Sequence, residues 1–350
     1  MAKRRLNKHQ VRRIQRQQQS RTASTVTDSK ADSTDHSRQL GPEQTGLVVC
    51  HFGQQLEIEA LTGEHLGERF RCYQRSNLPP LVTGDHVIWQ ADDENSGVVV
   101  AQLDRKSLIS RPNSRGTLRP VAANIDTVVV VIAPEPEPFA NLIDRYLVTI
   151  ENLSLEAIIL LNKADLLDHP AHTGQDSEIA TLLARYESIG YQTLTTSTKT
   201  EDGVSALRET LSERTMVFVG QSGVGKSSVI NALRDMENSE EAEYADVGEL
   251  SVGLAKGTHT TTATRLYHMP GSGDLIDSPG IREFGLDHVE ATDLIHGFRE
   301  FRPYLGYCRF RDCKHVNEPG CAILNAVAEG AINAERLHSY QLILQSQGAR

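Results

Sequence analysis

Residues 220–228, GQSGVGKSS, have the types and spacing of a phosphate-binding loop. The segment matches G-x-x-x-x-G-K-[ST], follows the apolar run MVFV and precedes the helix-like stretch SSVINALRD. Glycines let successive backbone N–H groups turn toward phosphate oxygens, with the positive end of the next helix beneath them. Lys226 is expected to reach the β- and γ-phosphates and the Ser227 hydroxyl to ligate Mg²⁺. The other residues expected around the phosphates are Gly220, Ser222, Gly223, Val224, Gly225 and Ser228.

The tetrapeptide Asn162-Lys163-Ala164-Asp165 directly follows the apolar run AIILL and has the N-K-x-D pattern of a guanine reader. The Asp165 carboxylate can accept hydrogen bonds from guanine N1–H and the 2-amino group, whereas adenine offers an acceptor at N1 and lacks that amine. Lys163 is expected to lie over the base and Asn162 to brace the loop. Such a tetrapeptide alone could be a helix cap. Beside a phosphate-binding loop, it predicts GTP and GDP as ligands.

Two more segments fit a nucleotide site. Ser197-Thr-Lys199 follows the β-prone run QTLTT and resembles the short loop that touches guanine O6 through its backbone, so Ser197 joins the predicted base-binding residues. Asp277-Ser-Pro-Gly280 fits D-x-x-G. In that motif Asp277 would hold the Mg²⁺ shell, and the Gly280 N–H would sense the γ-phosphate.

Residues 257–262, GTHTTT, lie between the phosphate-binding loop and D-x-x-G, where a switch loop with a magnesium-binding threonine belongs. The sequence does not decide among the three consecutive threonines, and we favour Thr261. The residue after Gly280 is Ile281, which has no hydrogen-bonding side chain to position water. Intrinsic hydrolysis is therefore expected to be slow. His259 is the candidate catalytic group within the chain, or else a solvent-exposed loop histidine.

Three of the five cysteines lie near the C-terminus with one histidine, as Cys308-x4-Cys313-x-His315-x5-Cys321. This set suits a tetrahedral Cys₃His zinc site, and disulfides are disfavoured in the cytosol. Because four protein ligands leave no open coordination position, the predicted zinc is structural. The other two cysteines are expected to be small buried side chains of a β-rich segment; they are Cys50 and Cys72.

The elements that must position these motifs are parallel strands and helices. Four apolar runs predict buried strands, at 127–133, 157–161, 216–219 and 274–276. Helical spacing of apolar residues recurs between them, at 139–152, 178–189 and 204–214. Strands alternating with helices predict a doubly wound α/β sheet, which binds ligands at the carboxyl ends of its strands.

The order of the motifs differs from that of a Ras-like GTPase, which begins with the phosphate-binding loop. Here the order is NKAD, STK, phosphate-binding loop, HTTT and DSPG. Strands of one sheet can be reconnected without moving the ligand site when the old termini lie close together. The sequence therefore predicts an α/β P-loop GTPase with circularly permuted motif order.

Residues 46–112 read as short β-prone pieces separated by turn residues such as Gly63, Gly67, Gly84 and Gly97. About five strands in roughly 70 residues fit an OB-type β-barrel, a fold that often binds oligonucleotides. A β-domain with only a packing role is the alternative.

The formal net charge of −10 hides an asymmetry, because residues 1–21 carry eight Lys and Arg and no acid. A basic arm on an acidic body suggests a nucleic-acid partner, with a solubilising tail as the alternative. Residues 22–44 are polar, and we expect 1–41 to be disordered in isolation. The longest apolar run, 128–133, is too short to span a bilayer, and the N-terminus lacks a secretory signal. We therefore expect a cytoplasmic protein without membrane contact.

Basic and aromatic side chains alternate around the predicted zinc site. They fit RNA phosphates and stacking bases, and they fit equally the core and solvated face of a small domain. The residues are Arg299, Arg302, Arg309, Arg311 and Lys314 among Phe298, Phe301, Tyr304, Tyr307 and Phe310.

Permuted GTPase motifs between a β-barrel and a Cys₃His module resemble the bacterial ribosome small subunit-dependent GTPases, the RsgA or YjeQ family, from about residue 42 to 345. The resemblance implies an OB-fold, a circularly permuted GTPase domain and a zinc-binding domain. It also implies a role late in maturation of the 30S ribosomal subunit, contact with 16S rRNA and GTP hydrolysis stimulated by the subunit. In that setting rRNA or a ribosomal protein could order the catalytic site in place of His259.

We therefore predict a multidomain protein, with a basic arm at 1–41, an OB-type β-barrel at 42–115, a permuted GTPase domain at 116–290 and a small, mostly helical zinc-binding domain at 291–350. It is expected to be a monomeric GTPase with one structural Zn²⁺ and with Mg²⁺ bound beside GTP. The alternative is an RNA-binding assembly scaffold in which GTP is a conformational ligand with negligible turnover. A P-loop kinase or ATPase is a weaker interpretation, because such a protein has no need of the guanine-binding NKAD motif.

Overall fold

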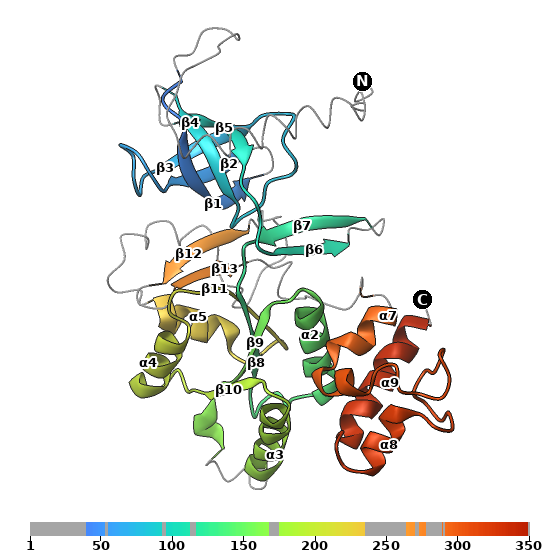
Figure 1. Ribbon diagram of the computed structural model, residues 1–350. Coiled ribbons are helices and arrows are strands. Elements are labelled where there is room, and N and C mark those ends of the chain that lie inside the picture. Colours follow the sequence, from blue (N-terminus) through green and yellow to red (C-terminus); the bar gives the residue numbers. More distant parts are fainter. Residues whose placement is uncertain are drawn as a thin grey trace, which may run out of the picture. The chain divides into compact units, whose positions relative to one another are not determined.

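The structure is a computed structural model that describes residues 40–52, 55–92, 96–112, 117–167, 175–234, 264–269, 273–277, 289 and 291–348. It divides into two compact units, shown in Figure 1. The first contains the N-terminal strands up to residue 108 with 120–124 and 263–266, and the second contains the rest. Within these described ranges, no helix combines the length and the apolar character that crossing a bilayer requires.

The first unit is a five-stranded barrel, as predicted. Its strands are β1 (Gln44–Phe52), β2 (Gln55–Ala60), β3 (Arg69–Gln74), β4 (His86–Ala91) and β5 (Ser96–Gln102). They pair in the order β1-β2-β3-β5-β4, and β4 also pairs with β1, which closes the sheet. Alternate residues of β2 point inward, and the core surrounds the fully buried Trp89. Cys50 and Cys72 are buried, as expected.

The first strand of the barrel begins at Gln44, and a backbone hydrogen bond ties the residues just before it to β4. Gly41 N donates to Ala91 O at 2.8 Å, and Gln44, the end of the predicted polar segment, is a buried residue of β1. Of the basic arm predicted at 1–41, residues 1–39 lie outside the described residues.

The second unit is built on a parallel sheet. Its strands are β8 (Thr127–Ile132), β9 (Glu156–Leu161), β10 (Gln192–Thr195), β11 (Thr215–Gly220) and β13 (Gly273–Asp277), in the order β10-β9-β8-β11-β13. Their apolar side chains pack against α4 and α5 in one buried cluster. Three strands were not predicted, namely β12 (Arg265–Met269) beside β13, and β6 (Leu108–Pro112) and β7 (Leu118–Ala123), which pair with each other.

The helices of this sheet are α2 (Ala140–Asn152), α3 (Gln175–Ser188), α4 (Glu201–Thr210) and α5 (Lys226–Arg234). The predicted 204–214 helix is wrong at its C-terminal end, since α4 stops at Thr210. Glu213 then takes a left-handed backbone, with φ of 60°, so the chain turns before entering β11.

The C-terminal part is mostly helical, as predicted. It contains α7 (Ala291–Leu294), the 3₁₀ turns η4 (Ile295–Gly297) and η5 (Arg299–Tyr304), α8 (Ala322–Ala328) and α9 (Ala334–Gly348), drawn orange to red in Figure 1. Phe298 and Phe301 stack with ring centroids 4.8 Å apart and meet Tyr340 edge-on. Val148 of α2 belongs to the same buried cluster, so this C-terminal module (residues 291–348) packs directly on a helix of the parallel sheet.

A buried charge network reinforces that packing. Arg336 of α9 is 1% exposed and contacts Asp144 of α2 and Glu300 of η5, and the Tyr186 hydroxyl of α3 donates to Asp144 at 2.7 Å. Burial opposes the charge of Arg336, but the two carboxylates outweigh it and its pKa lies above the ordinary arginine value. The network therefore links four elements far apart in sequence.

Candidate nucleotide site and metal centre

The phosphate-binding motif occupies the turn between β11 and α5, the strand-loop-helix arrangement that it requires. β11 ends at Gly220 and α5 begins at Lys226. Gly220 has φ of 139°, and a Cβ there would lie 2.3 Å from Val131 O. Gly225 has φ of 90°, and a Cβ would lie 2.4 Å from Asn162 Nδ2. Both positions therefore need glycine, because the backbone conformation and the lack of space each exclude a side chain.

The N-K-x-D segment lies against this loop, although Gly220 is 58 positions after Asn162. Asn162 Nδ2 donates to Val224 O at 2.9 Å. Lys163 Nζ donates to Gly223 O at 2.7 Å and to Glu135 O at 2.9 Å. The structure thus brings together the segments predicted to hold the base and the phosphates, at the carboxyl ends of β9 and β11.

The Asp165 carboxylate is held by the S-T-K loop. Ser197 Oγ donates to Asp165 Oδ1 at 2.7 Å, and Lys199 Nζ contacts Asp165 Oδ2. The hydrogen bonds from Lys199 and Ser197 hold the pKa of Asp165 below its ordinary value, so the carboxylate is a charged acceptor at neutral pH. The sequence placed Lys199 in this loop but did not reveal its contact with Asp165, which depends on how β9 and β10 pair.

The Lys226 side chain lies along the phosphate-binding loop. Its Nζ donates to Gly220 O and Gln221 O, each at 2.7 Å. Ser227, the predicted magnesium ligand, is half-buried in the first turn of α5, and Asp277 is the last residue of β13, next to β11 in the sheet.

Several predicted site residues lie outside the described residues. These are His259 and Thr261 of the switch loop, Gly280 of D-x-x-G and the neighbouring Ile281.

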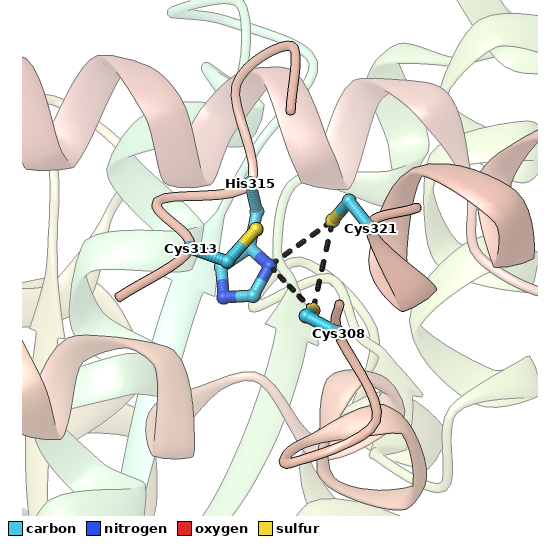
Figure 2. Close-up of side chains that lie close together, drawn as sticks. All are labelled: Cys308, Cys313, His315 and Cys321. Atoms are coloured by element: carbon cyan, nitrogen blue, oxygen red, sulfur yellow. Dashed lines mark hydrogen bonds between the residues drawn. The ribbon is translucent and has the colours of Figure 1, made fainter. Parts of the chain in front are cut away.

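The predicted zinc ligands converge in the C-terminal module (Figure 2). The ligand atoms of Cys308, Cys313, His315 and Cys321 all lie within 4.8 Å of one another. His315 Nδ1 is 3.5 Å from Cys308 Sγ and 3.2 Å from Cys321 Sγ, and these two sulfurs are 3.9 Å apart. A tetrahedral zinc with Zn–S bonds of about 2.3 Å separates its donors by roughly 3.5–4 Å. The donor set and its spacing therefore fit a metal ion.

The surroundings of this cluster also suit a closed metal site. Burial raises the pKa of Cys313 to about 12 and raises that of Cys321, and it lowers the pKa of His315. A metal ion bound here must therefore displace thiol protons. Glu318, which the sequence analysis did not single out, accepts from the backbone N–H of Lys314 at 2.9 Å and of Val316 at 2.8 Å. These bonds fix the loop that carries His315.

Some of the basic and aromatic residues of the C-terminal module fit the interpretation as a domain core, and others fit the interpretation as an RNA-binding surface. Phe298 and Phe301 are fully buried and form its core. Tyr307 and Phe310 are 79% and 43% exposed. Of the basic residues, Arg299 and Arg302 both pair with Glu151 of α2. Three others are exposed in the loops that carry the Cys₃His cluster (residues 305–321), namely Arg309, Arg311 and Lys314.

Comparison with known proteins gives independent evidence on the family of this chain. The family model described as RsgA GTPase matches residues 102–287. Proteins named small ribosomal subunit biogenesis GTPase RsgA from Pseudomonas fluorescens and Ectopseudomonas mendocina are each 52% identical over 347 residues, covering 99% of this chain and 98% of theirs. A protein of the same name from Azotobacter vinelandii is 50% identical over the same length.

Solved structures agree with these relatives. YjeQ from Thermotoga maritima is 31% identical, with a TM-score of 0.69 and coverage of 88% of this chain and 100% of that chain. YloQ, described as a circularly permuted GTPase, is 24% identical with a TM-score of 0.67, covers 90% of this chain and 97% of that chain, and supports the fold alone. The chain therefore belongs to the RsgA GTPase family, and it is a GTP-hydrolysing enzyme with circularly permuted motifs.

Proposed function

We propose that this GTPase acts in biogenesis of the small ribosomal subunit, binding the 30S particle through 16S rRNA and leaving it after hydrolysis of GTP to GDP and phosphate. The observation that supports this most is its identity of about one half, over nearly the whole length, with relatives named for that role. The scaffold alternative with negligible turnover is not favoured, because the family is one of GTPases. We further propose that the protein acts as a monomer in the cytoplasm, where subunits are assembled.

The nucleotide is assigned to the segments that meet beside β9 and β11. Phosphates would be bound by Gly220, Ser222, Gly223, Val224, Gly225, Lys226, Ser227 and Ser228, with Gly280 at the γ-phosphate. The base would be bound by Asn162, Lys163, Asp165 and Ser197. Because Lys226 Nζ donates to two loop carbonyls, phosphate binding would replace carbonyl acceptors by charged oxygens, which form stronger hydrogen bonds.

The magnesium ligands proposed are the Ser227 hydroxyl, Asp277 and Thr261. Mg²⁺ bound with GTP would neutralise charge on the phosphates. His259 remains the proposed catalytic group, since Ile281 follows D-x-x-G where a Ras-like protein has a glutamine. We expect His259→Ala to keep its affinity for GTP and lose turnover stimulated by the subunit; equal turnover in variant and wild type would remove His259 from the mechanism.

The metal proposed for the Cys₃His cluster is a single structural Zn²⁺, because Cys308, Cys313, His315 and Cys321 leave no coordination position for a substrate. Its role would be to hold the metal-binding loops, which expose Arg309, Phe310 and Arg311 to a polyanionic partner. The basic arm and the barrel are the other proposed RNA contacts.

Sedimentation with purified subunits tests the proposal. The full chain is incubated with 30S or 50S particles and with GDP or a non-hydrolysable GTP analogue. We expect preferential pelleting with 30S particles in the presence of the analogue and release in GDP. Equal pelleting with both particles, whatever the nucleotide, would contradict the proposed function.

A further inference from the structure

The strand that follows the predicted switch loop begins in the first unit and ends in the second. Residues 263–266 belong to the first unit, where Arg265 is the antiparallel partner of Cys50 in β1. From Tyr267 onward β12 belongs to the second unit and lies beside β13, whose last residue is Asp277. The backbone therefore runs without interruption from the barrel to the strand next to the one that ends in a proposed magnesium ligand.

Thr83, in the loop between β3 and β4, holds the start of this strand. Its side chain is fully buried, and Thr83 Oγ1 donates to Thr264 O at 2.9 Å. The backbone oxygen of Thr83 accepts from Ala123 N at 3.0 Å. Ala123 ends β7, and the chain enters the second unit at Ile125. Thr83 therefore contacts two of the segments through which the chain passes between the units.

The loop that carries Thr83 is itself fixed by a buried carboxylate. Asp85 is completely buried, and its Oδ2 accepts from Val82 N at 2.8 Å. Arg105 donates to both oxygens of Asp85, from Nε at 2.6 Å and from Nη2 at 2.7 Å, and Nη2 also donates to Pro80 O at 2.9 Å. Paired charge-assisted hydrogen bonds of this kind are strong and fix one geometry. The loop therefore gives Thr83 a preformed orientation.

A second contact holds the same strand by a side chain. Arg265 Nη2 lies 3.5 Å from Glu57 Oε2, and the guanidinium lies 5.8 Å from the centre of the Phe52 ring. A ligand-binding segment with a fixed end loses less conformational freedom on binding than one with a free end. The predicted switch threonines at 260–262 directly precede this strand, so holding the strand favours their binding to a ligand.

We propose that Thr83 is a positioning residue for the GTP-bound state, which holds the strand after the switch loop so that a threonine of 260–262 can reach Mg²⁺ beside the γ-phosphate. This inference rests on the proposed switch threonine, and it adds a residue of the barrel to the nucleotide switch. GDP has no γ-phosphate, so the contact should strengthen binding of GTP and leave binding of GDP unchanged.

Competition binding of GDP and of a non-hydrolysable GTP analogue to the full chain, both with Mg²⁺, tests the proposal. Thr83→Val removes the hydroxyl and keeps the branched shape, whereas Thr83→Ser keeps the hydroxyl. Thr62→Val is the matched control, because it removes a barrel threonine hydroxyl whose partner, at 3.0 Å, is the Thr45 hydroxyl. Melting temperatures report folding. A reference variant without switch threonines combines Thr260→Ala, Thr261→Ala and Thr262→Ala.

We expect Thr83→Val to lower the ratio of analogue affinity to GDP affinity by about fivefold, with the affinity for GDP unchanged. Thr83→Ser and Thr62→Val should keep the wild-type ratio. Glu57→Gln weakens the second contact of the strand and should lower the ratio by about twofold, which gives a test that does not depend on the folding of Thr83→Val.

An unchanged ratio in Thr83→Val and Glu57→Gln would overturn the inference. An equal loss of affinity for both nucleotides would also overturn it, because Thr83 would then serve the fold alone. If the reference variant loses the preference for the analogue while Thr83→Val keeps it, the switch threonines stand and only the role of Thr83 is excluded. If the reference variant keeps the wild-type ratio, the proposed switch threonine has failed, and the inference fails with it.

Discussion

The Lys226 ammonium is the main fixed cation of the phosphate-binding loop, and it already lies among the loop carbonyls. Lys226→Ala should lower affinity for GTP and GDP by at least about tenfold, because charge-assisted hydrogen bonds to phosphate are lost. Equilibrium binding of a fluorescent GDP measures the effect. Lys314→Ala, which removes an exposed lysine of the metal-binding loops, is the control and should bind normally. Equal affinity in both variants would contradict the assignment of the loop.

Asp165 provides two charged acceptors where guanine offers two donors. In Asp165→Asn one acceptor becomes an N–H donor, which matches the 2-oxo group of xanthine and opposes the 2-amino group of guanine. We therefore expect the preference to move from GDP toward XDP in a competition assay. A variant that still prefers GDP as strongly as wild type does would place the base elsewhere.

The residues of the site were predictable because most stand in short contiguous motifs with a fixed chemical purpose, as in 220–228 and 162–165. The contact between Lys199 and Asp165 could not be predicted from the sequence, because the two residues are 34 positions apart and meet only through strand pairing. Glu318 was missed for a related reason, since a carboxylate that accepts from its own loop looks in sequence like any exposed acid.

Helix α2 links the N-K-x-D segment to the C-terminal module. Lys163 contacts Glu135, which precedes α2, and Asp144 and Val148 of α2 contact the module. Arg336→Met leaves the buried Asp144 without its cation. We expect the free energy of unfolding of the second unit to fall by about 3 kcal/mol, the usual cost of an unpaired buried charge. Urea unfolding of the purified full chain, wild type and variant, measures the loss.

Arg302→Met is the matched control for that measurement. Arg302 also pairs with a carboxylate of α2, Glu151, but its side chain is 45% exposed, so its loss should cost less than about 1 kcal/mol. Similar small effects of both substitutions would mean that the Arg336 network does not stabilise the docking of the module.

If the Cys₃His cluster holds the proposed zinc, removal of one of its four side chains should release the metal and loosen the C-terminal module. Cys313→Ser should lose bound zinc, whereas Cys72→Ser, which changes a buried barrel cysteine, should keep one zinc per chain. Elemental analysis of the purified proteins gives the metal content, and limited proteolysis reports the order of residues 291–348. A full complement of zinc in Cys313→Ser would exclude the Cys₃His assignment.

The predicted helices and strands agree best with the observed ones where the sequence has a single clear periodicity of apolar residues. The all-apolar run of β8 and the helical spacing of α2 gave boundaries within one residue of those observed. The β6–β7 pair escaped prediction because its sequence, LISRPNSRGTLRP, lacks alternation and contains prolines. The predicted end of α4 was wrong because the left-handed residue after the helix is Glu213. A glycine, the residue that usually signals such a helix end in a sequence, is missing there.

The Arg336 network shows the limit of local patterns. Asp144, Glu300 and Arg336 each lie on a helical segment whose charges look solvent-facing in sequence, and only tertiary packing buries them together. Binary patterning cannot distinguish a buried charge pair from two surface charges.

In the complete chain, circular permutation connects the switch motif to the metal-binding module. D-x-x-G begins at the end of β13, and α7 of the module starts at residue 291, so a short segment joins the two. Because D-x-x-G and the module are neighbours in the sequence, we expect the bound nucleotide to influence the module, which also packs on α2 through Val148. Nucleotide state and affinity for the subunit should therefore be linked, and linkage requires that the subunit in turn alter the nucleotide site.

The most direct test of this account is GTP turnover by the purified full chain with and without 30S subunits, with 50S subunits and ATP as controls. We predict stimulation of roughly tenfold or more by 30S subunits alone and for GTP alone, because a group outside the Ras-type glutamine position must complete the catalytic site. Tight GTP binding with the same slow turnover in the presence and absence of 30S subunits would contradict the account.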